Sequence, residues 1–239
     1  MYKAFLFFRS ILFYAGYVVV TIGMSALFIV CFAFLSQRNR YRFASTWCMT
    51  ILNWLRLCCG VEYEIIGLEH IPSRAAVFLS NHQSSWETIL FYKLIYPLSP
   101  ILKKELLNIP FWGWALRLTK PIAIDRSKPR EAGKSLLTQG VQRLGEGNSL
   151  IVFPEGTRSS PDRLKKFSRS GATLAIAADA PVIPIAHNAG YAWPPRTFIK
   201  YPGKVTVEFG AAIDADNLTD LELTQKAEDW IRSHIVKRP

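Results

Sequence analysis

Residues 75–95 read AAVFLSNHQSSWETILFYKLI. The apolar run Ala75–Ser80 has the length of a buried strand, and Thr88–Ile95 has the residue spacing of a helix. The polar residues 81–87 therefore form the turn that follows a strand at its carboxyl end. Open α/β sheets bind ligands at this end of their strands, so the turn is the first candidate for a functional site.

Two interpretations of this turn remain open from the local pattern. Ser84 and Glu87 have the S-x-x-E spacing of a capping box, in which each side chain bonds the other residue's backbone N–H. Glu87 also lies five residues after His82. A carboxylate near an imidazole can fix the tautomer of the ring and stabilise the imidazolium that forms when the ring takes up a proton. The rest of the chain must decide between helix capping and acid–base chemistry.

Short strands alternate with helices from Val61 onward. This pattern predicts an α/β fold, with a mostly parallel sheet flanked by helices, in a catalytic domain over residues 61–239. A capping box at Thr219 and Glu222 is expected to begin the last helix. The expected strands are 61–66, 75–80, 101–102, 121–124, 149–153, 182–186 and 204–209, and the expected helices are 88–95, 131–145, 171–178 and 221–235, with a mixed helix or turn at 106–116.

A second polar loop, Pro154–Ser159, follows the expected strand 149–153. In a parallel sheet it opens on the same edge as the His82 turn, so the two loops can share a cleft. Gly156 allows the backbone to approach a ligand closely, and the guanidinium of Arg158 matches the oxygens of a phosphate. The alternative is an ordinary glycine turn with an arginine on the surface.

The first sixty residues have a different character. Residues 10–36 include no charged side chain over 27 positions, and about 20 apolar residues span a bilayer as a helix. The run is too long for a signal peptide and lacks a small-residue cleavage site. We therefore predict an N-terminal hydrophobic helical membrane anchor over residues 1–60. The sequence leaves open whether this run crosses the bilayer or lies in one leaflet.

Residues 41–60 form a second expected helix with an apolar face. Trp47 and Trp54 lie on that face, where their indoles suit the headgroup layer of a membrane. Packing of the same face against the catalytic domain is the alternative.

The charge of the chain indicates which ligands it can bind, and its cysteines indicate the redox compartment. The net charge is +11, and residues 98–170 carry 14 Lys/Arg against 6 Asp/Glu. Such a basic region favours phosphorylated substrates, coenzymes or acidic lipid surfaces. Nucleic acid is not expected as a partner, because no nucleic-acid-binding motif is evident. The four cysteines have no disulfide or metal-site spacing, which indicates a reducing compartment and no metal site.

Four blocks of this sequence resemble, in order, those of the glycerolipid acyltransferases, most closely the lysophosphatidate acyltransferases of bacteria. The resemblance covers most of residues 61–209. The blocks are Asn81-His82-Gln83-Ser84-Ser85-Trp86-Glu87, residues 103–113 with Ile124-Asp125-Arg126, Phe153-Pro154-Glu155-Gly156-Thr157-Arg158-Ser159, and Ala180-Pro181-Val182-Ile183-Pro184-Ile185.

The resemblance implies a role for each matching residue. His82 is implied as the general base, and Glu87 stands where the family has the aspartate that orients the histidine. The other implied positions fall into three groups. These are Arg158, Lys103, Lys104 and Arg126 for the substrate phosphate, Glu155, Gly156 and Thr157 for the thioester, oxyanion and acceptor site, and Pro181, Ile183 and Pro184 for the acyl-donor site.

The implied reaction moves a fatty acyl group from acyl-CoA or acyl carrier protein to the sn-2 hydroxyl of lysophosphatidate, giving phosphatidate. The thioester is a co-substrate, and no bound cofactor is expected. The implied partners are the lipid bilayer, lysophosphatidate and the thioester donor. The implied location is the inner (plasma) membrane, with the catalytic domain on its cytoplasmic face.

Two departures from the family pattern and three alternatives accompany this prediction. Glu87 replaces aspartate, and the family's F-K-x-G appears as Phe167-Ser168-Arg169-Ser170-Gly171. The acceptor could be another lysophospholipid or a lyso-aminolipid. An acyl-enzyme could form on Ser84 or Ser85. In a different class, the chain could be a non-catalytic basic membrane adaptor, which would leave the histidine–carboxylate pair unexplained.

Overall fold

The fold is known from a computed structural model that describes residues 1–125 and 127–236. Its centre is a six-stranded sheet that consists, in spatial order, of β1 (Val61–Ile66), β8 (Gly203–Phe209), β7 (Val182–His187), β2 (Val77–Ser80), β6 (Ser149–Val152) and β3 (Leu98–Ser99). Neighbouring strands are parallel except β7 and β8, which are antiparallel. A separate parallel pair consists of β4 (Ile101–Lys103) and β5 (Ile122–Ile124).

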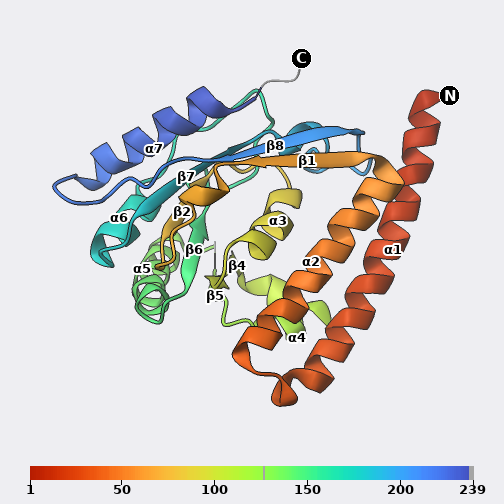
Figure 1. Cartoon of the computed structure of the whole chain (residues 1–239), viewed down its shortest axis with the longest axis horizontal. Helices are drawn as coiled ribbons and strands as arrows, with labels where there is room; N and C mark the ends of the chain where they lie inside the picture. Colours follow the sequence, from red (N-terminus) through yellow and green to blue (C-terminus); the bar gives the residue numbers. More distant parts are fainter. Residues whose placement is uncertain (126, 237–239) are drawn as a thin grey trace.

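Helices cover both faces of this sheet (Figure 1), which confirms the predicted α/β fold. One face carries α5 (Pro129–Gly145), α6 (Ser170–Ala177) and α7 (Asp220–His234). The other face carries α2 (Gln37–Cys59) and α3 (Trp86–Leu94), with α1 (Tyr2–Cys31) packed along α2. The shorter elements are α4 (Trp112–Arg117), η1 (Phe32–Phe34), η2 (Leu68–His70), η3 (Lys104–Asn108) and η4 (Ala189–Tyr191).

The strands that carry the two candidate loops are buried on both faces. In β2, Val77 and Leu79 belong to the core under α5, α6 and α7, whereas Phe78 belongs to the core under α2 and α3. β6 alternates in the same way. A strand buried on both faces is apolar at successive positions, which explains the continuous apolar runs in the sequence.

Most expected elements are present with shifts of one or two residues at their ends. The capping box of Thr219 and Glu222 is confirmed at the start of α7. β3 was not predicted, because two residues are too few to show periodicity. The mixed segment 106–116 divides into η3 and α4.

The indoles of α2 bond to α1. Trp47 Nε1 donates to Thr21 Oγ1 at 3.1 Å, and Trp54 Nε1 donates to the Phe13 carbonyl at 3.1 Å. Gly16 leaves room for this contact, since a Cβ there would lie 2.2 Å from Trp54 Nε1. These two indoles therefore pack on α1, and their placement in the headgroup layer stays a prediction. The apolar face of α2 also packs against the catalytic domain, because Ile51 and Leu55 of α2 are buried in the core with α3.

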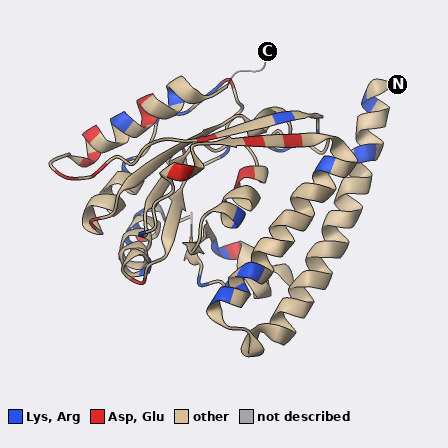
Figure 2. Ribbon diagram, viewed as in Figure 1, with Lys and Arg blue, Asp and Glu red and all other residues tan. Residues whose placement is uncertain are grey.

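Helix α1 combines a covered side with an apolar outer side. Residues 2–34 are long and apolar enough to cross a membrane, and the middle of the helix carries no charged side chain (Figure 2). Phe13 and Phe28 are buried against the protein. The outer side exposes large apolar residues, including Phe8, Leu12, Val19 and Val30.

A buried lysine joins α1 to the segment between η4 and β8. The Lys200 backbone N–H donates to Ser10 Oγ of α1 at 2.9 Å. Lys200 Nζ donates to the carbonyls of Thr197 at 2.9 Å and Phe198 at 2.7 Å. The same ammonium lies over the rings of Tyr14 at 4.9 Å and Trp193 at 5.0 Å. These contacts hold segment 192–201 against the helix.

Substitution of Lys200 is expected to change how stability depends on pH. Burial lowers the pKa of Lys200 to about 8, although nearby Cys59 opposes the shift. Between that value and the unfolded value near 10.5, the unfolded chain binds the proton and the folded chain does not, so stability rises with pH. The free energy of unfolding of wild type minus that of Lys200→Met should therefore rise from pH 8 to 10, by at most about 1.4 kcal/mol per pH unit. Denaturant titrations of both proteins test this, and a constant difference would contradict it.

Candidate active site

The His82 turn and the loop after β6 lie side by side because β2 and β6 are parallel neighbours. The imidazole of His82 stacks on the Phe153 ring, with the centroids 4.1 Å apart and an interplanar angle of 20°. The Ser159 N–H donates to the His82 carbonyl at 2.8 Å. The predicted meeting of these two loops at one edge of the sheet is therefore confirmed.

One carboxylate oxygen of Glu87 takes part both in helix capping and in the pair with His82. Oε1 lies 2.8 Å from His82 Nδ1 and accepts from the backbone N–H groups of Gln83 at 3.0 Å and Ser84 at 2.7 Å. The reciprocal half of the capping box is absent at this turn, since Ser84 Oγ accepts from the Trp86 N–H at 3.1 Å. Glu87 is 0% exposed. The carboxylate therefore caps the turn before α3 and also orients the imidazole.

This contact determines which nitrogen of His82 can react. Nδ1 donates its proton to the carboxylate, so Nε2 has the lone pair. Burial by itself would raise the pKa of Glu87, but nearby His187 and the hydrogen bonds from His82 and the Ser84 N–H outweigh it and lower the pKa. The ionised carboxylate can stabilise an imidazolium that forms at His82.

The neighbours of His82 fix the turn to the end of β7. Asn81 Nδ2 donates to the His187 carbonyl at 2.8 Å, and the His187 N–H donates to Asn81 Oδ1 at 3.1 Å. Gln83 Oε1 accepts from the Gly190 N–H at 3.0 Å. The imidazole is therefore presented by a turn that is anchored on both sides.

The carboxylate of Glu155 lies beneath the histidine turn. It accepts from the backbone N–H groups of His82 at 2.7 Å and Lys165 at 3.1 Å, and from the Ser159 hydroxyl. Glu155 is buried and is not among the residues that line the cavity described below. In this position it joins the two loops.

Gly156, Thr157 and Arg158 form the exposed part of the second loop. Gly156 has a φ of 71°, a backbone conformation that favours glycine. Its N–H donates to the Phe153 carbonyl at 2.9 Å, which closes the turn. Thr157 and Arg158 line the same cavity as His82.

This cavity has a volume of about 640 Å³ and lies between the N-terminal helices and the catalytic domain. His82 is 8% exposed and is part of the cavity lining. Much of the wall is apolar and comes from α1, α2, α3, β4 and α4, including Met24, Phe28, Phe43, Trp112 and Leu116. Lys103, Arg158 and Arg196 also line it, and none of the described lining residues is Asp or Glu. The cavity therefore combines cations with space for an apolar chain.

Other residues with implied roles lie outside this lining. Lys104 is exposed and is not among the lining residues, and Arg126 lies outside the described residues. Pro181, Ile183 and Pro184 are buried in or beside β7, within the sheet. Ser85 lines the cavity, whereas Ser84 is fully buried.

Two residues of this site have no role that a sequence pattern indicates. Phe153 read as part of a buried strand, and only the adjacent strands β2 and β6 bring it under the imidazole. Arg196 lies outside the recognised blocks, and the preceding Pro194-Pro195 pair was its only signal. In the described part of the chain, His, Cys, Asp and Glu form no group of three or more that could hold a metal ion.

Comparison with known proteins connects this site to an enzyme family. The family model described as Acyltransferase matches residues 62–188. A 1-acyl-sn-glycerol-3-phosphate acyltransferase of Pseudomonas aeruginosa is 48% identical over 198 residues, which cover 81% of this chain and 77% of the relative. An enzyme of the same name from Limnanthes alba is 34% identical, with 72% of this chain and 60% of the relative covered.

The fold is similar to that of a solved structure. The crystal structure of the 1-acyl-sn-glycerophosphate (LPA) acyltransferase PlsC from Thermotoga maritima matches with a TM-score of 0.81. The match covers 98% of this chain and 95% of that chain at 24% sequence identity.

Proposed function

The chain belongs to the acyltransferase family and is an O-acyltransferase, and on that premise we propose that it transfers a fatty acyl group from a thioester to the sn-2 hydroxyl of lysophosphatidate. The observation that carries the proposal is the cavity itself. A histidine paired with a buried carboxylate lines a space that also has cations and an apolar wall. Lysophosphatidate has a hydroxyl, a phosphate monoester and an acyl chain, which match these three parts.

The proposed chemistry is direct transfer with His82 as general base. Nε2 takes the proton of the acceptor hydroxyl while its oxygen attacks the thioester carbonyl, so that a C–O bond forms. The tetrahedral intermediate collapses with cleavage of the C–S bond, and the imidazolium returns the proton to the thiolate. The ionised Glu87 stabilises the imidazolium between these steps.

The intermediate carries a negatively charged oxygen that needs a donor. The Gly156 N–H donates within its own turn, so the backbone N–H of Thr157 is the proposed donor from this loop. A route through an acyl-enzyme on Ser84 is less consistent with the site, because Ser84 is buried and its hydroxyl accepts from the Trp86 N–H. Unchanged transfer by Ser84→Ala would agree with direct transfer.

The phosphate of the acceptor is proposed to bind Arg158, with Lys103 as a second cation. Arg158→Ala should raise the KM for lysophosphatidate about 10- to 100-fold, because a charge-assisted hydrogen bond contributes roughly 1.5–3 kcal/mol. The KM for the thioester should change much less. Steady-state kinetics with each substrate varied in turn test this, with Lys134→Ala on α5 as a control for loss of one charge. A larger effect on the thioester KM would reassign Arg158 to the donor.

A purified-enzyme assay tests the function as a whole. Thioester consumption is measured with acyl-CoA and with acyl carrier protein donors, each with and without lysophosphatidate. A transferase needs both substrates, a hydrolase consumes thioester alone, and a membrane adaptor consumes none. Panels of other lysophospholipids and lyso-aminolipids identify the acceptor class, and the two donors identify the carrier.

The proposed location is the inner membrane, with the catalytic domain on its cytoplasmic face. The protein covers one side of α1 along much of its length, from Arg9, which donates to the Cys58 carbonyl, to Phe28, which stacks on Phe43. A helix that is packed on α2 and has a long apolar outer side is suited to anchor the chain in lipid. Protease digestion of sealed inverted vesicles should remove the catalytic domain, and its protection there would contradict the cytoplasmic placement.

A further inference from the structure

We propose that Arg196 binds the acceptor's phosphate monoester where the cavity meets the membrane surface, and so favours phosphomonoester lysolipids over diester lysolipids. This inference rests on the proposed function and deepens it. Arg196 belongs to none of the sequence blocks that suggested the other phosphate ligands. It lines the cavity together with His82 and Arg158.

The backbone at Arg196 is held in an unfavourable conformation. Its φ is 60°, in the left-handed region that costs free energy for any residue with a Cβ. Glycine would fit this position without that cost. Backbone strain at a residue that lines a substrate cavity is an indication of function.

The loop that carries Arg196 is closed and anchored. The Tyr201 N–H donates to the Ala192 carbonyl at 2.9 Å, which closes its base. Thr197 Oγ1 donates to the Pro194 carbonyl at 3.1 Å, next to the strained residue. The buried ammonium of Lys200 binds two carbonyls of the same loop. Arg196 is therefore presented by a fixed support, as a specific ligand contact requires.

The same loop shares the apolar outer surface of α1. Phe198 is 43% exposed, and its ring lies 5.2 Å from that of Phe7 and 5.0 Å from that of Tyr14. Both partners belong to α1. An exposed aromatic residue beside an apolar helix suits the interface with lipid, and the proposal places the guanidinium two residues away at the level of the headgroups. Lipid phosphates occupy that level.

Charge favours a phosphate monoester as the group bound. The three cations that line the cavity come from three separate segments, and no described lining residue is acidic. Among the residues that the structure describes, no Asp or Glu forms an ion pair with Arg196. A monoester carries up to two negative charges and three terminal oxygens, which match guanidinium forks better than a singly charged diester.

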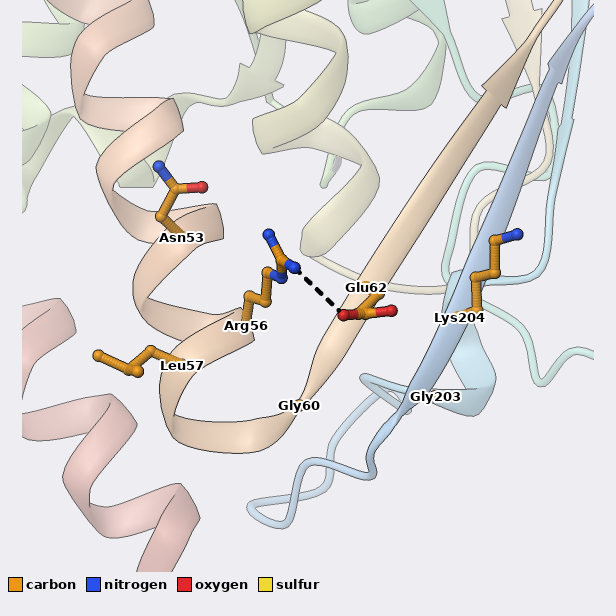
Figure 3. A pocket seen from close by; sticks show the side chains of 7 residues that line it. All are labelled: Asn53, Arg56, Leu57, Gly60, Glu62, Gly203 and Lys204. Atoms are coloured by element: carbon orange, nitrogen blue, oxygen red, sulfur yellow. Dashed lines mark ion pairs between the residues drawn. The ribbon is translucent and has the colours of Figure 1, made fainter.

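A second hollow on the protein contains an arginine that is paired with an acid, and this arginine provides a control for Arg196. It lies at the end of α2 and is lined in part by Arg56, Glu62 and Lys204 (Figure 3). Arg56 Nη2 lies 3.4 Å from Glu62 Oε1, so its charge is already balanced by an acid. Arg56 is exposed like Arg196 but does not line the catalytic cavity. Arg56→Gln is therefore a matched control for Arg196→Gln.

Steady-state kinetics with lysophosphatidate, a diester lysolipid and the thioester test the inference. Arg196→Gln should raise the KM for lysophosphatidate about 10-fold, with little change in kcat or in the thioester KM. The preference for lysophosphatidate over the diester lysolipid should fall by about the same factor. Arg196→Lys should recover part of the loss, and Arg56→Gln should behave as wild type. Arg196→Gly should lose affinity while its melting temperature stays the same or rises.

Each other outcome has a definite meaning. An unchanged KM for lysophosphatidate in both Arg196→Gln and Arg196→Gly would overturn the inference, as would a rise confined to the thioester KM. A lowered melting temperature of Arg196→Gly with unchanged KM would assign the residue to folding and also overturn it. Failure of the wild-type enzyme to acylate lysophosphatidate would instead reject the proposed function.

Discussion

His82→Ala is expected to lower kcat by about 10²–10⁴-fold, because the general base would no longer take the hydroxyl proton. The ring lines the cavity, and its Nδ1 is bound to Glu87, so Nε2 is the nitrogen left to accept the proton. The KM values for both substrates should change much less, since the cations and the apolar wall remain. Single-turnover measurements of the acyl transfer step provide the test.

The control for this variant is a histidine on the opposite side of the sheet. His234 ends α7, where its ring stacks on Trp230, and it is not among the residues that line the cavity. His234→Ala should retain kcat within about two-fold, in line with surface substitutions of small effect. Circular dichroism of both variants verifies the fold. A His82→Ala enzyme that is folded and retains near-normal kcat would remove the proposed mechanism.

Glu87→Gln is expected to lower kcat by about 10²-fold or more while the turn keeps its shape. The amide oxygen can still accept from the Gln83 and Ser84 N–H groups, but it cannot stabilise an imidazolium by charge. Glu87→Ala should also destabilise the fold by roughly 1–3 kcal/mol, because buried donors would lose their acceptor. Rates and melting temperatures of both variants separate the electrostatic role from the capping role.

Glu87→Asp tests whether a carboxylate on a side chain that is one methylene shorter can still orient His82. Because the chain resembles a family with aspartate at this place, Glu87→Asp should retain more activity than Glu87→Ala. Equal losses in these two variants, together with normal kcat in Glu87→Gln, would limit Glu87 to helix capping. The other carboxylate oxygen, Oε2, is buried and has no hydrogen-bond partner among the described residues. Replacing it with an amide NH₂ therefore breaks no existing hydrogen bond.

The sequence was sufficient to predict β2, β6 and the two loops at their ends, because these signals are local. An apolar run and the polar residues that follow it identify β2 and its turn without knowledge of the rest of the chain. The same is true of β6 and the loop that contains Arg158. Their meeting followed from one further rule, that parallel strands end at the same edge.

The remaining features depend on contacts between distant residues, which no local pattern reports. Glu155 bonds the His82 N–H across 73 residues of sequence, so its place beneath the turn could not be predicted. No local pattern distinguishes Lys200 from a surface lysine, yet its ammonium is buried between aromatic rings of α1 and its own loop. The indoles of Trp47 and Trp54 had the spacing of a membrane face, but they bond to another helix.

Arg196 could not be predicted from the sequence for a different reason. Its identity and neighbours suggest an ordinary surface arginine, and its positive φ is a property of the folded backbone alone. Sequence reasoning expects glycine or asparagine at such a position.

One side of helix α1 lines the cavity, and its other side is exposed. Tyr17, Met24 and Phe28 face the substrate cavity, while Val18, Val19 and Ile22 of the same turns face outward. If the outer side of α1 lies in lipid as proposed, a single helix forms both a wall of the cavity and the surface that meets the hydrocarbon.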